Sequence, residues 1–179
     1  MTQPFLDQVA TFAANRVAPA AGVWSTGATP EPDLYHEAAM LGLLGVEVPV
    51  AQGGRGYDFP TRAAAYARMA GADFGFAMSL VNTHNIALRL SEDAPRAAQE
   101  RYLPALLEGR MSACTALTEP STGSDLAAIR TTARQTDAGW LLNGEKTWII
   151  NGRHASLSIV YAQCKEIGDS SGIAAFLVD

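Results

Sequence analysis

ALTEPSTGSD, residues 116–125, is the stretch at which the sequence changes character, and a second distinctive stretch, NGEKTWIING, follows at residues 143–152. Before the first stretch, apolar residues recur at the three- and four-residue spacing of helices that pack on one face. After it, apolar and polar residues alternate, as in half-buried strands. We therefore expect an α+β protein, in which an all-α domain over residues 1–110 precedes an antiparallel β domain over residues 111–179.

The first domain is expected to contain five helices, at residues 5–17, 34–41, 61–71 and 72–90 and from Pro95 to Gly109. Pro19 and Gly22 should end the first helix, and Asp33 and Gly42 suit the two ends of the second. The fourth is hydrophobic nearly all round and should therefore be central. It carries His84, which has no second histidine or cysteine at ligand spacing. A hydrogen-bonded core histidine is thus favoured over a metal ligand.

The second domain is expected to contain five short strands, at residues 112–118, 131–136, 140–150, 157–163 and 173–178. Asp137-Ala138-Gly139 should form a tight turn, and Asn143-Gly144 a turn or bulge. The last strand would leave an open sheet edge whose amides need a partner. Either another chain covers that edge, or the sequence is a fragment with a truncated β domain.

Composition limits the classes of function. The chain has 13 Lys and Arg against 18 Asp and Glu, a net charge of −5, without clustered basic residues, so nucleic acid is not an expected partner. Cys114 and Cys164 are too far apart for a metal knuckle and too few for a disulfide scaffold, so both should be reduced strand residues. There is no secretory leader and no run of ~18 apolar residues. We expect a cytoplasmic protein without a membrane span or a metal.

Three local features permit more than one interpretation. The glycine-rich segment 52–56 lacks the following Lys-Ser or Lys-Thr and the preceding strand of a phosphate loop, so a plain turn is favoured. Gly123-Ser124-Asp125 could present backbone amides to an anion or to ring carbonyl oxygens, or Ser124 or Asp125 could simply cap a turn. Trp148 could be a core aromatic or a flat wall for a planar cofactor.

The two stretches resemble motifs of the acyl-CoA dehydrogenase family. Residues 116–128 are similar to its pattern of small residue, aliphatic, Thr, Glu, two variable residues, small residue, Gly, Ser and Asp, and residues 142–152 are similar to its second motif. The segments 41–54 and 101–109 resemble its helical domain. The similarity covers nearly the whole chain, in the family's order.

The resemblance implies an α domain and a β domain with FAD between them, followed by a C-terminal helical bundle that this sequence lacks. In the family, the residues matching Leu117 and Thr118 hydrogen-bond the isoalloxazine ring, and the residue matching Trp148 packs against it. Those matching Gly123 and Ser124 lie by the ribityl and pyrophosphate groups and the acyl-CoA. The implied cofactor-binding residues are Leu117, Thr118, Gly123, Ser124, Trp148, Ile149 and Ile150, with Ser124 also at the substrate.

The implied reaction is α,β-dehydrogenation of an acyl-CoA thioester, with removal of the α-proton by a carboxylate and hydride transfer to FAD. The family's catalytic Glu lies in the C-terminal domain, and the counterpart of Glu119 is not the base. No catalytic residue is therefore assigned, and this chain alone should be close to inert. Acyl-CoA, an electron-transfer flavoprotein or other acceptor, and a homo-oligomer or complementary chain are the implied partners.

Two residues depart from the family pattern. Thr122 replaces a small residue before Gly123, and Ile150 stands where the family usually has a Thr or Ser hydroxyl that hydrogen-bonds flavin N5. Loss of one neutral hydrogen bond costs about 0.5 to 1.5 kcal/mol, which FAD binding could survive. Two alternatives therefore stay open: a non-catalytic partner subunit, and a fragment of a related flavin oxidase or monooxygenase.

Overall fold

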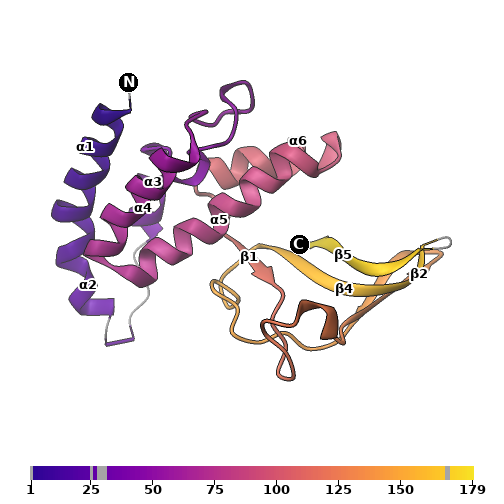
Figure 1. Ribbon diagram of the computed structural model, residues 1–179. Coiled ribbons are helices and arrows are strands. Elements are labelled where there is room, and N and C mark those ends of the chain that lie inside the picture. The colour runs from indigo at the N-terminus through magenta and orange to yellow at the C-terminus, as the bar shows by residue number, and fades with distance from the viewer. Residues whose placement is uncertain (1, 25, 28–31, 168–169) are drawn as a thin grey trace. The chain divides into compact units, whose positions relative to one another are not determined.

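The computed structural model describes residues 2–24, 26–27, 32–167 and 170–179. The chain divides into two compact units, Met1–Ser112 and Ala113–Asp179. The first contains the long helices and the second contains the strands, which confirms the expected order of a helical part and a β part (Figure 1). The change of structure falls just before β1 (Ala113–Ala116), the strand that leads into the first stretch.

The helical elements of the first unit are α1 (Gln3–Phe12), a π-helical segment (Ala13–Val17), α2 (Ala18–Trp24), α3 (Pro32–Met40), two 3-10 turns (Leu43–Gly45 and Val50–Gln52), α4 (Phe59–Ala72), α5 (Phe74–Asp93) and α6 (Arg96–Leu107). The expectation that Pro19 ends the first helix was wrong. Pro19 lies in the first turn of α2, directly after the π-helical segment, and a proline is tolerated in a first turn because its missing N–H is not needed there.

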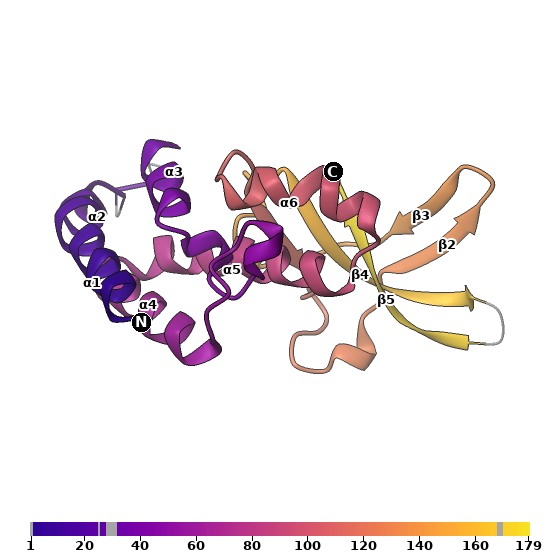
Figure 2. The ribbon, with the colours of Figure 1, turned by 90° about the horizontal axis from the view of Figure 1, so that it is seen from above.

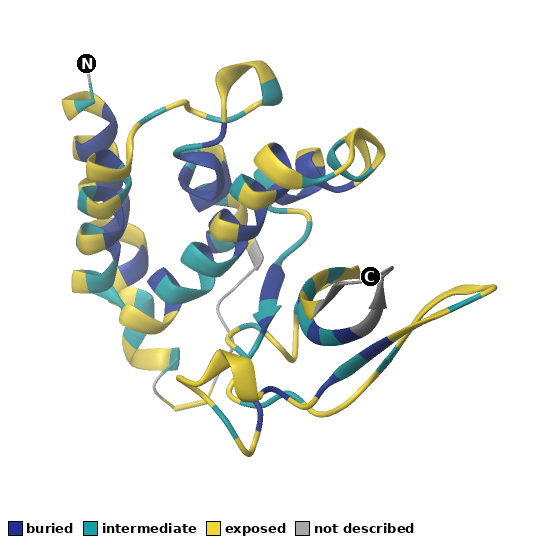
Figure 3. Cartoon of the chain, turned by 45° about the vertical axis from the view of Figure 1, so that its right-hand side comes forward, coloured by how far each residue is buried: buried dark blue, intermediate teal, exposed yellow. Residues whose placement is uncertain are grey.

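Two aspartates, Asp58 and Asp73, cap the starts of the consecutive helices α4 and α5. The Asp58 carboxylate accepts a hydrogen bond from the Thr61 N–H at 3.0 Å, and the Asp73 carboxylate accepts one from the Phe76 N–H at 2.6 Å. Each satisfies a backbone donor that the first helical turn leaves without a partner. Within the unit, α5 packs against both α4 and α6, and its buried positions follow the helix along its length (Figure 3). The central position predicted for this helix is confirmed.

His84 and the glycine-rich segment have structural roles in this unit. His84 is fully buried, and its Nε2 accepts the Glu47 N–H at 3.3 Å. The described residues contain no group of three or more His, Cys, Asp or Glu side chains placed to hold a metal. Gly53 adopts φ 90° at the end of a 3-10 turn, and a side chain on Gly54 would collide with the Val48 backbone. The turn therefore accounts for both glycines.

The sheet of the second unit is mixed, so the expectation of a purely antiparallel domain was wrong. Besides β1 it contains β2 (Thr132–Thr136), β3 (Gly139–Asn143), β4 (Leu157–Ile167) and β5 (Ser170–Val178). The order is β1-β4-β2-β3, with β5 also paired to β4. The hairpins β2–β3 and β4–β5 are antiparallel, as predicted, but β1 and β2 both run parallel to β4.

The end of β3 explains this difference. The expected strand 140–150 ends at Asn143. The next residue, Gly144, adopts φ 157° and lies so close to Thr131 that a side chain would not fit there. Residues 144–156 then form an irregular connection that carries the chain back to the start of β4. Because β3 runs antiparallel to β2, this connection and β3 together form the crossover from β2 to the parallel strand β4. The second stretch is therefore mostly a crossover and not a strand.

The apolar core of the sheet is small. Ala133, Ala162 and Cys164 form a buried cluster, against which partly buried Leu142 and Phe176 pack. Parallel pairing between β2 and β4 covers only residues 132–133 and 163–164, and the two hairpins diverge toward their tips (Figure 2). Among the described strands, β5 pairs with β4 alone, so its outer edge is open.

The two cysteines are reduced, and no described helix is long and apolar enough to span a membrane. Cys114 on β1 and Cys164 on β4 are buried and free, as predicted for reduced strand residues. In the ranges that the structure describes, every helix is too short or too polar to cross a bilayer.

Candidate functional site

Residues from the two stretches lie side by side at the end of β1. The Thr147 N–H donates to the Thr118 carbonyl at 2.9 Å, and Lys146 Nζ donates to the Leu117 carbonyl at 3.0 Å. Further along, Asn151 Nδ2 donates to the Ala113 carbonyl at 3.1 Å. The crossover therefore runs back along β1, and two segments that are far apart in sequence become one surface.

Below that surface, Glu119 is buried, with 5% of its surface exposed. Its Oε1 accepts from Lys146 Nζ at 2.8 Å, from Thr131 Oγ1 at 2.6 Å and from the Thr131 N–H at 2.9 Å. Its Oε2 accepts from the Arg130 N–H at 2.6 Å. Four donors thus converge on one carboxylate and occupy both of its oxygens.

This environment fixes the charge of Glu119. Burial by itself raises the pKa of a carboxyl group, but the hydrogen bonds from Lys146, Thr131 and the two backbone amides outweigh it and lower the pKa of Glu119 to about 2. A carboxylate that is ionised at neutral pH and already holds four donors is a poor proton acceptor. The structure thus gives a physical reason why Glu119 is unsuited to be a general base.

Trp148 is exposed, in contrast to this buried network. Its exposed fraction is 88%, and its backbone is left-handed at φ 55°. It directly follows Thr147, whose N–H is bound to the Thr118 carbonyl at the end of β1. A bulky side chain rarely adopts this conformation, and a large exposed aromatic is not needed for folding. The interpretation of Trp148 as a core aromatic was therefore wrong.

Ile149 and Ile150 continue the second stretch into a turn. The Gly152 N–H donates to the Ile149 carbonyl at 3.0 Å, and Asn151 also has a left-handed backbone, at φ 66°. Ile149 is half-buried, whereas Ile150 is 42% exposed. The position where a hydroxyl was expected by resemblance thus presents an exposed aliphatic surface beside Trp148.

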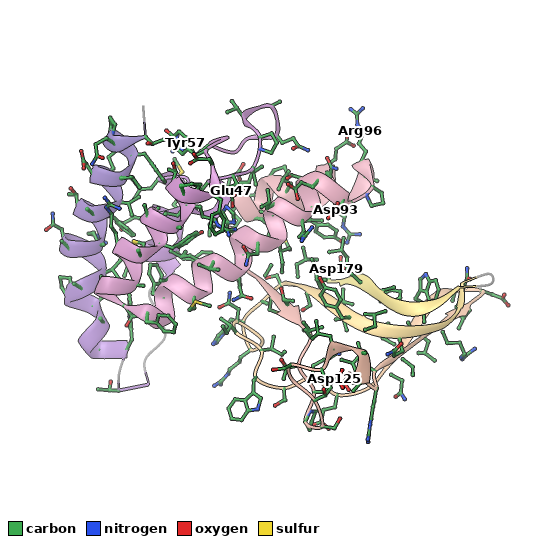
Figure 4. All side chains as sticks on the ribbon, viewed as in Figure 1. Glu47, Tyr57, Asp93, Arg96, Asp125 and Asp179 are labelled. Atoms are coloured by element: carbon green, nitrogen blue, oxygen red, sulfur yellow. The ribbon has the colours of Figure 1, made fainter. Side chains whose placement is uncertain are left out.

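The remaining residues of the first stretch form an exposed loop. Glu119 and Thr122 exchange backbone hydrogen bonds at 2.9 and 3.1 Å, and Thr122 Oγ1 donates to the Asp125 carbonyl at 2.8 Å. Gly123 and Ser124 are exposed, and Asp125 follows on the same loop (Figure 4). Thr122 therefore stabilises the loop, and its extra bulk does not prevent the turn.

A capped helix start does not explain this loop. Asp125 precedes the 3-10 turn Leu126–Ala128, but no side chain caps that turn. A side chain on Gly123 would meet no atom of this chain within 4 Å. The fold therefore does not itself require a glycine here, and the backbone is open to a ligand.

The contribution of Lys146 was missed in the sequence. Its side chain is only 11% exposed, and it binds both Leu117 and Glu119. The available signal was one residue of each charge, Lys146 in the second stretch and Glu119 in the first, because buried charges are retained only when they are paired.

An all-α domain followed by a mixed β domain, with these two stretches joined at the end of β1, defines the class of protein: the N-terminal and middle domains of an acyl-CoA dehydrogenase. Family comparison agrees over almost the whole chain. The model for "Acyl-CoA dehydrogenase, N-terminal domain" matches residues 2–110, and that for "Acyl-CoA dehydrogenase, middle domain" matches residues 114–179. The chain belongs to the acyl-CoA dehydrogenase family.

Individual relatives are similar at moderate identity. Mitochondrial isovaleryl-CoA dehydrogenase of Arabidopsis thaliana is 30% identical over 98% of this chain and 44% of its own length. The crystal structure of a glutaryl-CoA dehydrogenase from Mycobacterium smegmatis, in complex with FADH2, matches with a TM-score of 0.90 at 30% identity, over 99% of this chain and 45% of that one. PigA with FAD and proline matches with a TM-score of 0.88 at 26% identity, over 99% and 47%. The chain thus spans less than half the length of these relatives.

Proposed function

We propose that this chain supplies part of the FAD site of an acyl-CoA dehydrogenase-like oxidoreductase, which removes the α and β hydrogens of an acyl-CoA thioester. The observation that carries the proposal is the exposed Trp148, which has a left-handed backbone at φ 55° and directly follows Thr147, the residue bound to the Thr118 carbonyl. An exposed aromatic side chain next to this link supports a ring wall made by the residues that the family resemblance assigns to the isoalloxazine ring.

The hydrogen-bonding groups at the end of β1 fit a ring with carbonyl oxygens. The carbonyls of Leu117 and Thr118 already accept bonds from Lys146 and Thr147. Thr118 still has two donors for a ligand, its hydroxyl and its N–H. These donors complement the acceptors of the isoalloxazine ring. Gly123 and Ser124 would approach the ribityl and pyrophosphate groups, with Ser124 also at the substrate.

When bound, FAD supplies the hydride-accepting chemistry, while the protein binds, orients and polarises. In this proposal, Leu117, Thr118, Trp148, Ile149 and Ile150 form the wall that orients the ring. Glu119 stays ionised below that wall and does not take part in proton transfer. The carboxylate that removes the α-proton is assigned to no residue of this chain, and it would come from further sequence or a complementary subunit. An electron-transfer flavoprotein or another acceptor would reoxidise the flavin.

Ile150 favours a second candidate, a flavin oxidase or monooxygenase on the same scaffold. An exposed isoleucine stands where the family usually donates a hydroxyl hydrogen bond to the flavin. PigA, which is structurally similar to this chain, was solved with FAD and proline, so a protein of this fold is found with a small molecule other than an acyl-CoA. Stopped-flow measurement of the reaction of the reduced flavin with oxygen separates the two: slow reoxidation supports a dehydrogenase, and fast reoxidation supports the alternative.

Titration of the purified chain with FAD tests the cofactor proposal. Binding should quench both flavin and tryptophan fluorescence and should saturate at one FAD per chain. Trp148→Ala should weaken binding, whereas Trp140→Ala, which also alters an exposed tryptophan, should not. Equal affinity in both variants would contradict the assigned ring wall. Reduction of the bound FAD by an acyl-CoA with this chain alone would overturn the assignment of the base to another segment.

A further inference from the structure

Glu119 and Lys146 form a buried link between the two stretches, here called the Glu119–Lys146 clamp. Lys146 Nζ lies 2.8 Å from Glu119 Oε1 and 3.0 Å from the Leu117 carbonyl oxygen. The Glu119 side chain is 3% exposed and the Lys146 side chain is 11% exposed, so both are largely shielded from solvent. Two charges removed from water are tolerated only with good geometry and further hydrogen bonds, and the clamp has both.

The clamp also reaches a third segment. The backbone N–H groups of Arg130 and Thr131 donate to the Glu119 carboxylate at 2.6 and 2.9 Å. The Thr131 carbonyl in turn accepts the Gln163 N–H of β4 at 2.8 Å. One carboxylate therefore fixes the first stretch to the second stretch and, through Thr131, to the middle of the sheet.

Each member of the clamp adjoins a residue of the candidate ring wall. Glu119 directly follows Thr118, and Lys146 stands two residues before Trp148. The bond from Thr147 to Thr118 lies between them, at 2.9 Å. The Lys146 side chain, two residues before Trp148, thus ties the backbone next to this bond to Leu117 and Glu119 of the first stretch.

We propose that Glu119 and Lys146 are positioning residues, which set the distance between Thr118 and Trp148 and so determine how the two stretches hold the flavin ring. The proposal rests on the proposed function for its ligand, but the geometry that it assigns exists without one. The clamp acts from below the surface, through the backbone, and does not touch the ring.

The clamp has a fixed polarity. Two backbone N–H groups and the Thr131 hydroxyl face the position of residue 119, and all of these can donate, whereas the Leu117 carbonyl faces residue 146 and can only accept. Exchanging the charges would set an ammonium against the two N–H groups and a carboxylate against a carbonyl. The double variant Glu119→Lys with Lys146→Glu should therefore not restore the link between the two stretches that either single change breaks.

Amide hydrogen exchange by NMR tests the positioning role without flavin. Lys146→Met should lower the protection of the Thr147 amide by about 10- to 100-fold, the loss expected for charge-assisted hydrogen bonds, while amides of α5 keep their protection. Lys146→Arg, which retains the charge, should recover part of the protection. Glu100→Gln, which removes a partner from the exposed Arg96–Glu100 pair, is the matched control. It should change neither the protection of the Thr147 amide nor that of the α5 amides. Unchanged protection of Thr147 in Lys146→Met would overturn the proposal.

FAD titration of the same variants gives the second measurement. Lys146→Met should bind FAD about 10- to 100-fold more weakly than the unaltered chain, and its bound flavin should show a changed visible circular dichroism spectrum at saturation. A purely structural role would leave the spectrum of the bound flavin unchanged, and that result would overturn the proposal. If the unaltered chain binds no FAD while Lys146→Met still loses Thr147 protection, the proposed function fails and the clamp's hold on the backbone is supported.

Discussion

The helical unit and the β unit treat buried polar groups in opposite ways. In the helical unit, His84 lies in the core with its Nδ1 unpaired among the described residues, and burial, assisted by the charge of Arg62, lowers the pKa of His84 to about 4. In the β unit, Glu119 is buried as an ion with four donors. The helical unit thus depends on keeping a group neutral, and the β unit on keeping one charged.

Their apolar surfaces differ as well. One cluster of the helical core includes residues of α1, α3, α4 and α5, and α5 and α6 bury further apolar side chains, among them Ile86, Leu90, Leu103 and Leu106. In the β unit, the cluster around Ala162 is small, and the exposed large apolar side chains are Leu126, Trp140, Leu141, Trp148, Ile150, Ile173, Leu177 and Val178. Exposed apolar side chains that gather on one unit are typical of a surface that binds a ligand or a partner.

The largest expected effect comes from removing the buried charge of the β unit. Glu119→Ala leaves Lys146 and two backbone N–H groups without their acceptor, and should destabilise the β unit by about 3 to 5 kcal/mol. Urea unfolding followed by residue-resolved NMR should show the strands lost first and the helices retained. Glu100→Gln, at an exposed ion pair, should cost less than about 0.5 kcal/mol. If the strands and the helices of Glu119→Ala unfold at the same urea concentration, the expectation that the β unit is destabilised selectively is contradicted.

The next largest effect is expected on acidification, which should lower the stability of the helical unit at a higher pH than that of the β unit. The pKa of His84 is lower in the folded chain than its usual 6.5, so the unfolded state binds more protons between pH 6.5 and about 4, and stability falls as the pH falls through that range. From pH 7 to pH 5 the helical unit should lose on the order of 2 kcal/mol.

Glu119 sets a different window for the β unit. Its pKa is depressed from 4.5 to about 2, so its contribution is complete above pH 4.5 and is lost only as the pH falls toward 2. Unfolding curves at pH 7 and pH 5 check the difference. His84→Asn should flatten the pH dependence of the helical unit, and an equal loss in the β unit over this range would refute the contrast.

A smaller effect, of opposite sign, is expected at Trp148. Glycine adopts φ 55° without strain, so Trp148→Gly should stabilise the β unit by about 0.5 to 1 kcal/mol and at the same time remove the ring wall. Thermal unfolding and FAD titration of the same sample measure the two changes. A gain in stability together with a loss of FAD binding would show that the strained residue is kept for the ligand.

The smallest effect on folding is expected at Ile150. Because this side chain is 42% exposed, Ile150→Thr should change the free energy of unfolding by less than about 0.5 kcal/mol. The added hydroxyl should strengthen FAD binding by roughly 0.5 to 1.5 kcal/mol, up to about tenfold. Ile150→Val, which adds no hydroxyl, is the control, and an equal gain in both variants would show that size and not hydrogen bonding is responsible.

The sequence predicted the order of the two parts because periodicity is a local property. The helices around Asp58 and Asp73, the turn before Gly139 and the core position of His84 all depend on neighbouring residues. The parallel pairing of β4 could not be read in this way, because it depends on where the 144–156 crossover goes. The β-rich run of residues 140–150 indicated one strand, but β3 ends at Asn143, before Gly144, which lies too close to Thr131 for any side chain.

In the candidate site, too, the sequence predicted the residues of the two motifs but not the contact between distant residues that joins them. Resemblance identified Leu117, Thr118, Gly123, Ser124, Trp148, Ile149 and Ile150, and their roles toward FAD stay predictions. The residues that hold these positions in place, Lys146 and Glu119, were not recognised, because their importance lies in a contact across 27 positions of sequence. Burial of a charged pair is a property of the folded chain, and no local pattern reports it.

The parallel pairing of β1 with β4 has a consequence for synthesis on the ribosome. Every partner needed by the helical unit has left the ribosome once α6 has emerged, whereas Ala113 must wait for Leu157 before it can pair. Domains fold from the N terminus as they appear, and contacts between distant residues form late. The surface around Trp148 is therefore completed late, after the helices of the first unit have been synthesised.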